Sequence, residues 1–354
     1  MPCARIRNAV RITWNALLSA SQSWSIMSIL YFSILSYRTA HGISEHMDSR
    51  VKNLICLLDY SPEEIRSILE RANALKRNRH KNEPQAMRDK TGVLIFEKPS
   101  LRTRITFETA IYELGGHAIN LDSGMVQMGK RESVEDVARN LGRWVHLIII
   151  RTFSHDTLIR FSRNCAIPVI NALTDSYHPC QALAFAQTVE ENLHGRTKVK
   201  VVFVGDGNNV CASLMILCAK LGYDFTLACP DGYELPAKLV QTCADIGRRH
   251  NAVIAVTHDP ATAVADASFI YTDVWTSMGQ ESQKDKRKND FKGFQVNAKL
   301  VSLAPPDVRV SHCLPAHRGE EISSDVLDSP ACIAFDEAEN RLHVQKAVIV
   351  HLFS

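Results

Sequence analysis

The sequence has few of the features that mark disordered, membrane-spanning or disulfide-built proteins. Its 354 residues include ten cysteines, and none of them form a C-x-x-C motif. Charged residues make up 22% and hydrophobic residues 45%, which is the balance of a globular protein. Internal repeats and low-complexity segments are absent. These features exclude intrinsic disorder, collagen-like repeats and a polytopic membrane protein, and the lack of a disulfide framework favours a reducing compartment.

Excess charge of one sign is also nearly absent. The formal net charge is +3, far below what a nucleic-acid-binding surface needs. Residues 1–46 contain four arginines and one acid, and removing them from the totals of 41 basic and 38 acidic residues leaves 37 of each. The rest of the chain is therefore formally neutral, and bulk charge predicts no nucleic-acid partner.

Cofactor and metal motifs are incomplete. Residues 205–207 (Gly-Asp-Gly) begin like a dinucleotide fingerprint, but Val210 stands where the third glycine belongs, which argues against a dinucleotide-binding oxidoreductase. His312, Cys313 and His317 could suggest zinc, but the chain has no second ligand pair at metal-binding spacing. The sequence therefore predicts no cofactor and no metal.

Residues 1–46 differ from the rest by their arginines, their lack of acids and an apolar stretch from Trp24 to Leu35. Three interpretations stay open. Translation starts at Met47 and the leader is an upstream extension, or the leader is an organelle transit peptide, or it is a membrane anchor whose apolar core is interrupted by serines. In each case we expect the leader to stand outside the fold. The expected location is cytoplasmic, or organellar if the leader is a transit peptide.

The remaining chain alternates short apolar runs with helix-patterned stretches. Ser61 is predicted to cap a helix, with Pro62 in the first turn and Glu64 at the capping-box position. The charged run 283–292 is interpreted as a solvated helix face or loop. Buried strands are predicted at seven apolar runs, residues 92–96, 145–150, 167–170, 199–204, 252–256, 268–271 and 308–312. This alternation predicts an α/β fold with two doubly wound domains, each with a mainly parallel sheet flanked by helices.

The strongest chemical motif follows the first of these strands. Ser100, Arg102, Thr103 and Arg104 stand at the start of the next predicted helix. Free backbone N–H groups and the positive end of the helix dipole favour anions at such a place. Two hydroxyls and two guanidiniums beside them predict a phosphate site.

Polar residues also follow other predicted strands. Asn208 and Asn209 come after one strand and Asp273 after another, at the strand ends where α/β proteins bind ligands. His178 and Gln181 stand three residues apart at a helix start, so their side chains project to the same face.

Six segments together resemble one enzyme family. In order and spacing they are similar to the ornithine carbamoyltransferases, and they comprise residues 100–104, 178–181, 205–209, 273–279, 312–318 and 336–341. The resemblance covers essentially all of residues 47–354. The Ser-Met-Gly part of residues 273–279 separates this family from the aspartate and putrescine carbamoyltransferases, which share the phosphate motif.

The resemblance implies a reaction without a cofactor. The family transfers the carbamoyl group of carbamoyl phosphate to the side-chain amine of L-ornithine, giving citrulline and phosphate. This step belongs to arginine metabolism, and both directions, arginine biosynthesis and arginine breakdown, stay open. Arg151 and His178 are implied to be catalytic, directing hydrogen bonds at the carbonyl oxygen together with Thr103. Arg104 is implied to support the phosphate motif without contacting the substrate itself. The residues implied to bind carbamoyl phosphate are Ser100, Leu101 through its backbone, Arg102, Thr103, Gln127, Arg151, His178, Gln181, Cys313, Leu314 and Arg341.

The resemblance also implies an ornithine site. Asp273 matches the family residue that pairs with the α-ammonium group. Asn209, Ser277 and Met278 match the residues at the α-carboxylate. Cys313 is implied to position the attacking amine and to help deprotonate it, without forming a covalent bond.

The implied domains follow the same order along the chain. We expect a leader at 1–46, a carbamoyl-phosphate-binding domain at 47–180 and a linking helix at 181–193. An ornithine-binding domain is expected at 194–332. A C-terminal helix at 333–354 is expected to pack back on the first domain.

The resemblance further implies an assembly. Gln127 lies in a segment similar to the family loop that reaches carbamoyl phosphate in a neighbouring subunit, so a homotrimer or a multiple of trimers is expected. The Leu314-Pro315 peptide is implied to be cis. Phe185 departs from the family, which usually has an aspartate there, and this affects local geometry rather than the reaction. Two alternatives stay open, a carbamoyltransferase acting on a modified ornithine or another amine, and a non-catalytic paralogue.

Overall fold

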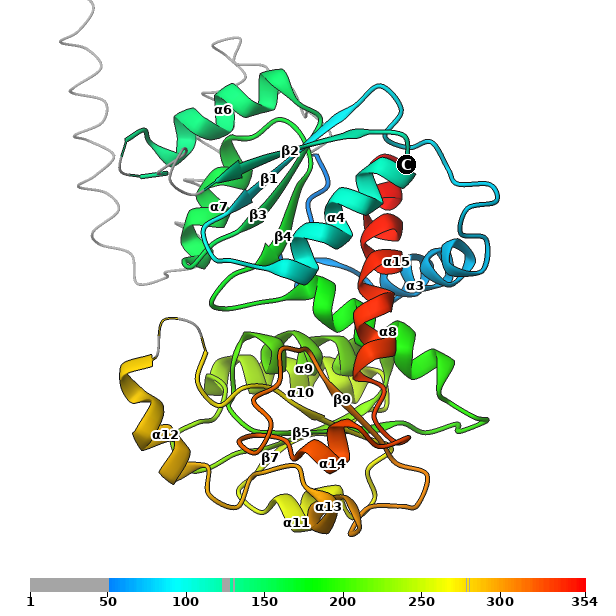
Figure 1. The fold of residues 1–354 in the computed structure, drawn as a ribbon, viewed down its shortest axis with the longest axis vertical. Helices are drawn as coiled ribbons and strands as arrows, with labels where there is room; N and C mark the ends of the chain where they lie inside the picture. Colours follow the sequence, from blue (N-terminus) through cyan, green and yellow to red (C-terminus); the bar gives the residue numbers. More distant parts are fainter. Residues whose placement is uncertain (1–50, 123–127, 130, 278, 280) are drawn as a thin grey trace, which may run out of the picture. The chain divides into compact units, whose positions relative to one another are not determined.

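The computed structural model describes residues 51–354, except for residues 123–127, 130, 278 and 280. The leader therefore lies outside the described residues, as do the predicted site residues Gln127 and Met278. The described residues form two parallel β-sheets flanked by helices (Figure 1), which confirms the predicted α/β fold with two domains.

The first sheet has the strand order β2-β1-β3-β4, and every neighbouring pair is parallel. Its strands alternate their side chains between two apolar layers. Val93 and Ile95 pack with α6 and α7 on one face, whereas Leu94 packs with α4 on the other. The elements are α3 (Pro62–Arg77), β1 (Thr91–Phe96), α4 (Leu101–Glu113), β2 (His117–Asp122), α6 (Val134–Trp144), β3 (Leu147–Arg151), α7 (His155–Asn164) and β4 (Val169–Leu173).

The second sheet has the order β7-β6-β5-β8-β9 and is also parallel throughout. Val202 and Ile270 pack on one face with α11 and α13, whereas Phe203 and Tyr271 face α8, α9 and α10. The elements are α8 (Pro179–Glu191), β5 (Lys200–Val204), α9 (Asn209–Leu221), β6 (Asp224–Ala228), α10 (Ala237–Arg249), β7 (Ile254–Thr257), α11 (Pro260–Val264), β8 (Phe269–Thr272), α12 (Lys284–Asp290), α13 (Ala298–Val301), β9 (Arg309–His312), α14 (Ser324–Leu327) and α15 (Ala334–Leu352). Short 3-10 turns lie at Leu57–Asp59 and Glu281–Gln283.

All seven predicted strands are present, and two further strands were missed. Strand β2 lies at the edge of the first sheet, where Ile119 is 38% exposed. Strand β6 begins with Asp224 and contains Thr226, so its sequence is not a continuous apolar run. The predicted capping box is confirmed, because the Ser61 hydroxyl accepts from the backbone N–H of Glu64 and the Glu64 carboxylate accepts from that of Ser61.

Each sheet has one point where the strand order reverses direction. In the first sheet this point lies between β1 and β3, and in the second between β5 and β8. The crevice outside the carboxyl ends of two such strands is where open α/β sheets bind ligands. Part of the predicted site lies at or just after these four strands, namely residues 100–103, Arg151, Asn209, Asp273 and Ser277, so the topology places these residues at two binding crevices. His178 and Gln181 follow β4, Cys313 and Leu314 follow β9, and Arg341 lies on α15.

Helix α15 contacts the first sheet's helices although it follows the second sheet in sequence. Its main neighbours are α3, α8 and α4 (Figure 1). The helix is buried along most of its length and carries Glu337 and Arg341 on its first turns. It therefore brings the 336–341 segment next to the N-terminus of α4.

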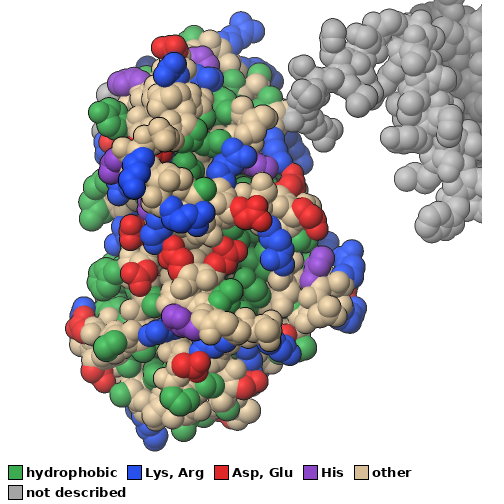
Figure 2. All heavy atoms as spheres, turned by 90° about the vertical axis from the view of Figure 1, so that its right-hand side faces the viewer, with side chains coloured by type: hydrophobic (Ala, Val, Ile, Leu, Met, Phe, Trp, Pro, Cys, Tyr) green, Lys and Arg blue, Asp and Glu red, His purple; other side chains and the backbone are tan. Residues whose placement is uncertain are grey.

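The face shown in Figure 2 has acidic and basic side chains interspersed, without a continuous area of one sign. This agrees with the formal neutrality of the body sequence. Of the helices in the described part of the chain, none has the length and apolar character that a bilayer-spanning helix needs.

Candidate active site

One cavity of about 490 Å³ gathers the predicted site residues. Its walls come from the carboxyl ends of β1, β3, β4, β5, β8 and β9, from the start of α8 and from α15. It includes every predicted site residue in the described part of the chain: Ser100, Leu101, Arg102, Thr103, Arg151, His178, Gln181, Asn209, Asp273, Ser277, Cys313, Leu314 and Arg341. The two switch-point crevices thus open into a common space.

The phosphate motif forms the N-terminus of α4. Ser100 is the N-cap, and its hydroxyl oxygen accepts from the backbone N–H of Thr103 at 3.3 Å. Arg102 and Thr103 line the cavity. Arg104 points elsewhere and pairs with Glu108 at 3.0 Å on the exposed side of the helix. An anion in the cavity can therefore meet the helix dipole and Arg102, but not Arg104.

Three guanidiniums meet in the cavity without a carboxylate partner among the recorded ion pairs of the described residues. Arg151 is the last residue of β3 and is 9% exposed. Burial, reinforced by the charges of Arg341 and Arg102, lowers its pKa to about 10. Burial also lowers the pKa values of Arg102 and Arg341. A cluster of like charges held out of water in this way is stabilised by a polyanion.

His178 and Gln181 lie at the start of α8, as predicted. His178 is the N-cap residue, and its backbone N–H donates to the Ser213 hydroxyl at 2.7 Å. Burial and the nearby arginines lower the pKa of His178 well below its usual value, so its imidazole is neutral at pH 7. Three buried nitrogens here have no hydrogen-bond partner within the described residues: His178 Nδ1, Arg151 Nε and Arg341 Nε.

A buried carboxylate that the sequence analysis did not assign connects this site to the second sheet. Glu337 Oε1 accepts from Gln181 Nε2 at 2.6 Å and from the Tyr271 hydroxyl at 2.8 Å, and Oε2 accepts from Ser311. Gln181 Oε1 in turn accepts from Arg341. Burial raises the pKa of Glu337 to about 7.

Arg341 also reaches α4, where its Nη2 donates to Thr103 Oγ1 at 2.9 Å. The chain of hydrogen bonds therefore runs from Tyr271 and Ser311 through Glu337 and Gln181 to the phosphate helix. The sequence implies Thr103, Gln181 and Arg341 as site residues, whereas the role of Glu337 depends on packing that no spacing reveals.

Asp273 and Cys313 line the cavity from the second sheet, after β8 and β9. Asp273 follows β8, and its Oδ1 accepts from the Cys313 thiol at 2.8 Å and from the Val274 backbone N–H at 2.7 Å. Among the described residues that line the cavity, Asp273 is the only carboxylate. Burial and the charge of Asp273 raise the pKa of Cys313 well above its usual value.

The two asparagines after β5 have different partners. Asn208 caps α9 and donates from Nδ2 to Asp273 Oδ2 at 2.7 Å. Asn209 donates from Nδ2 to the Thr174 carbonyl, at the end of β4 in the first sheet. The Leu314-Pro315 peptide is cis, which confirms the prediction.

One set of possible metal ligands lies at the edge of the cavity, where Asp273 and Cys313 line it and the buried His312 lies next to them. Donor atoms of Asp273, His312 and Cys313 lie within 4.8 Å of one another. However, His312 Nδ1 accepts from the Leu314 backbone N–H, and its Nε2 contacts the buried Glu321 carboxylate at 3.1 Å. Because both ring nitrogens have protein partners, this arrangement leaves only Asp273 and Cys313 to hold an ion.

The interpretation of residues 283–292 as a solvated face is wrong at two positions, Arg287 and Phe291, which are both buried. Residues 284–290 form α12, but Arg287 is 7% exposed. Its Nη1 donates to Asp206 Oδ2 and to the Trp275 carbonyl, each at 2.8 Å. Burial raises the pKa of Asp206, and Arg287 opposes this shift. A charged run in sequence gave no sign of this buried pair.

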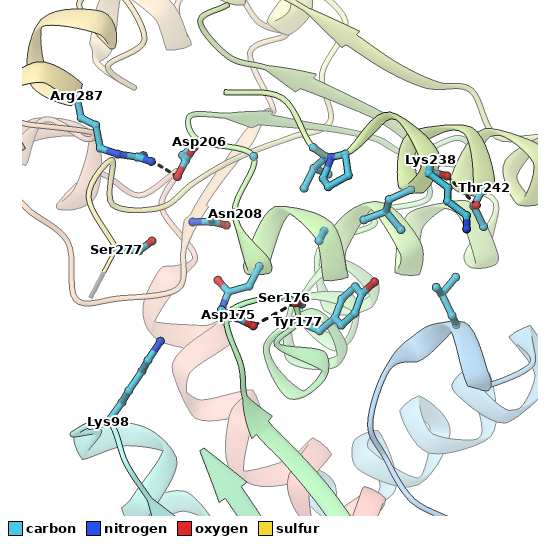
Figure 3. Close-up of a pocket in the computed structure, with 17 residues that line it drawn as sticks. Lys98, Asp175, Ser176, Tyr177, Asp206, Asn208, Lys238, Thr242, Ser277 and Arg287 are labelled. Atoms are coloured by element: carbon cyan, nitrogen blue, oxygen red, sulfur yellow. Dashed lines mark hydrogen bonds and ion pairs between the residues drawn. The ribbon is translucent and has the colours of Figure 1, made fainter. Parts of the chain in front are cut away.

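Arg287 and Asp206 border a second cavity of about 630 Å³, which adjoins the first (Figure 3). The two cavities share Lys98, Asn209 and Ser277. Figure 3 shows Lys98 pointing into this space and Arg287 reaching Asp206 from the opposite side.

The unusual Phe185 does not reach the cavity. It is fully buried and packs edge-to-face against Tyr271 and Phe269, with ring centroids 4.9 and 6.0 Å apart. Aromatic packing behind Tyr271 therefore occupies the place where the resemblance led us to expect a carboxylate.

Comparisons with known proteins identify the family of the chain. Residues 52–191 match the carbamoyl-P binding domain of aspartate/ornithine carbamoyltransferase, and residues 197–352 match its Asp/Orn binding domain. An ornithine carbamoyltransferase of Pyrococcus abyssi is 47% identical over 302 residues, which cover 85% of this chain and 95% of that protein. A protein of Pyrococcus furiosus named "Ornithine carbamoyltransferase, anabolic" is 46% identical and covers 84% of this chain and 95% of its own length.

Solved structures are similar over the same region. The ornithine carbamoyltransferase of Pyrococcus furiosus superposes with a TM-score of 0.81 at 46% identity, covering 84% of this chain and 96% of that one. A mitochondrial ornithine carbamoyltransferase from Coccidioides immitis has a TM-score of 0.79 at 31% identity, covering 86% and 99%. The chain therefore belongs to the aspartate/ornithine carbamoyltransferase family.

Proposed function

We propose that this protein transfers the carbamoyl group of carbamoyl phosphate to the side-chain amine of L-ornithine, giving L-citrulline and phosphate. The observation that carries this proposal is the division of one cavity by charge. Arg102 and Arg151 come from elements of the first sheet and Arg341 from α15, whereas the Asp273 carboxylate follows β8 of the second sheet. A polyanion and an amino acid with two amines are substrates of matching charge. The anabolic relative supports a place in arginine biosynthesis.

The cationic side binds the phosphate leaving group and stabilises the oxyanion that forms on the carbonyl oxygen. The N-terminus of α4, with Ser100, the Leu101 backbone, Arg102 and Thr103, holds the phosphate. Arg151 and neutral His178 donate to the carbonyl oxygen as it becomes an oxyanion, and donors of this kind usually give the largest catalytic contribution.

The remaining contacts orient the carbamoyl group. Gln181 and the backbone carbonyls near Cys313 and Leu314 orient the carbamoyl NH2, and Arg341 reaches the substrate from α15. The neighbour's Gln127 completes this set in the proposed assembly.

The acidic side accounts for ornithine. Asp273 pairs with the α-ammonium group, and Asn209, Ser277 and Met278 bind near the α-carboxylate. The attacking amine must be neutral, because its lone pair adds to the carbonyl carbon and gives the tetrahedral oxyanion. The oxyanion then collapses, the C–O bond to phosphate breaks, and the departing phosphate takes the proton that the amine loses. The raised pKa of Cys313 keeps its thiol protonated at neutral pH. Cys313 therefore positions the amine but does not accept its proton directly.

We also propose the expected domain division at residues 180, 193 and 332, and a homotrimer or a multiple of trimers. Helix α4 supports the assembly, because it exposes an apolar stripe of Leu101, Ile105 and Tyr112 at 71%, 53% and 79%. Such a stripe is typical of a surface that a partner covers. Mass measurement in solution tests this proposal, and a stable monomer would contradict it.

For a chain that starts at Met47 we propose a cytoplasmic location, and an organellar one where residues 1–46 act as a transit peptide. All described site residues lie beyond Met47. Residues 47–354 alone are therefore expected to make citrulline as fast as the full chain, and a folded but inactive product would show that the leader is needed.

A substrate panel tests the central proposal. The purified protein is assayed for carbamoyl transfer to ornithine, acetylated ornithine, putrescine and aspartate, with phosphate release as a second readout. We expect turnover with ornithine and little with the others. Preference for acetylated ornithine would support the modified-substrate alternative, and no turnover with any amine would support a non-catalytic paralogue.

A further inference from the structure

The side chain of Asn208 joins the turns that follow two neighbouring strands, β5 and β8. Its Oδ1 accepts from the backbone N–H groups of Val210 and Cys211, each at 3.0 Å, and so caps α9. Its Nδ2 donates to Asp273 Oδ2 at 2.7 Å. One amide thus serves a helix end and a carboxylate at the same time.

The Asp273 carboxylate is held from both of its oxygens. Val274 and Cys313 donate to Oδ1, at 2.7 and 2.8 Å. The terminal torsion of an aspartate is broad and roughly two-fold, so donors on one oxygen alone do not fix the plane of the group. Asn208 supplies the recorded donor on Oδ2 and therefore defines that plane.

We propose that Asn208 is a positioning residue for ornithine, which acts by fixing the orientation of the Asp273 carboxylate. This inference rests on the proposed function, in which Asp273 pairs with the α-ammonium group. Asn208 does not itself have to touch the substrate. The carbamoyl phosphate side of the cavity has no direct bond to Asn208, so its affinity does not depend on this amide.

Substitution by serine separates the two bonds of Asn208. Serine caps a helix about as well as asparagine, but it lacks the amide donor that reaches Asp273. The matched control is Asn297→Ser, because Asn297 caps α13 in the same way, with Oδ1 accepting from Leu300 at 3.1 Å. Asn208→Gly, which costs an N-cap only a few tenths of a kcal/mol, replaces the serine variant if that variant does not fold.

We expect Asn208→Ser to raise KM for ornithine about tenfold, since a hydrogen bond to a charged group contributes enough free energy for that change. The Kd of carbamoyl phosphate, measured by calorimetry, stays within about twofold. Asn297→Ser changes neither quantity. In an Asp273→Ala background, Asn208→Ser has no further effect on KM for ornithine, because the group through which it acts is gone.

Two results would overturn the inference. One is an unchanged KM for ornithine in folded Asn208→Ser. The other is an equal loss of carbamoyl phosphate affinity, which indicates a general structural role. Failure of the proposed function looks different, because then the unmodified protein makes no citrulline from ornithine.

Discussion

The two sides of the cavity differ in how their charges are supported. On the side proposed to bind carbamoyl phosphate, Arg151 and Arg341 are buried with neutral partners or unpartnered nitrogens. On the side proposed to bind ornithine, Asp273 accepts from Asn208 and Cys313, and Arg287 is paired with Asp206. The charges of the cationic side thus gain an ionic partner only when substrate binds. The charges of the acidic side already have hydrogen-bond or ion-pair partners within the protein.

This difference separates residues kept for binding from residues that also hold the fold. A charge that lacks a protein partner costs stability in the free protein and gains a partner when ligand binds. A charge in a buried pair has the opposite property, because its removal leaves the other charge unpaired. The predictions below test this contrast.

Replacement of Arg151 should have the largest effect on rate and little on stability. We expect Arg151→Gln to reduce kcat about 10³-fold, the upper range for loss of one oxyanion donor. Its thermal midpoint should not fall, because burial and neighbouring arginines already disfavour the charge. Steady-state kinetics and thermal denaturation measure both, with Arg139→Gln, an exposed arginine, as the control. A large loss of stability in Arg151→Gln would contradict the view that Arg151 serves binding rather than the fold.

Replacement of Arg287 should act mainly on stability. Arg287→Met leaves Asp206 buried without its cation, which costs about 3–5 kcal/mol for a buried pair. Lys286→Met is the control, because Lys286 lies on the same helix but is exposed. Denaturant unfolding measures the difference. An equal change in unfolding free energy in the two variants would show that the ion pair of Arg287 with Asp206 does not stabilise the fold.

Glu337 connects the two sides and should make stability depend on pH. Its pKa is raised from 4.5 to about 7 by burial, so the folded protein keeps a proton that the unfolded chain loses. The stabilising contribution is therefore full below pH 4.5 and is lost as pH rises through 7. We expect unfolding free energy to fall by up to about 3 kcal/mol between pH 4.5 and 8 from this group.

Glu337→Gln cannot titrate and should lack this part of the fall. Denaturant unfolding of both proteins at pH 5 and pH 8 isolates the contribution, because the other titrating groups are common to both. Parallel pH profiles would mean that the Glu337 carboxyl is ionised in the folded protein at pH 5.

The smallest expected effect is a pair of opposite pH dependences in the kinetics. The kcat/KM for ornithine should rise up to about tenfold per pH unit between pH 7 and 9, because only the neutral amine attacks and its pKa is near 10.4. The kcat/KM for carbamoyl phosphate should fall as pH approaches 10, because burial and the charges of Arg341 and Arg102 lower the pKa of Arg151 to about 10. Initial rates with each substrate limiting measure the two profiles, and parallel profiles would contradict this assignment.

The sequence was informative wherever a residue's environment is local. Buried strands, the capped helices and the polar residues at strand ends all follow from short patterns, and the family resemblance assigned roles to them. The edge strand β2 escaped notice because an exposed edge does not need a continuous apolar run. Strand β6 escaped because Asp224 and Thr226 interrupt it.

Residues whose role depends on distant partners could not be found in this way. Asn208 and Asp273 are 65 positions apart, Arg287 and Asp206 are 81 apart, and Gln181 and Glu337 are 156 apart. Only the fold brings these pairs together. For the same reason the sequence predicts that Arg287 is exposed like the charged residues around it, although it is buried.

The position of α15 has a consequence for synthesis of the protein on the ribosome. Domains generally fold in the order in which they are made, so the first sheet and the α4 phosphate helix can form early. Arg341 and Glu337 arrive only with α15, after the whole second sheet has been translated. A nascent or prematurely terminated chain that ends before residue 334 has the helix N-terminus but not the arginine that contacts Thr103. Such chains should not bind carbamoyl phosphate tightly. Tight binding of carbamoyl phosphate should therefore begin only after α15 has been translated.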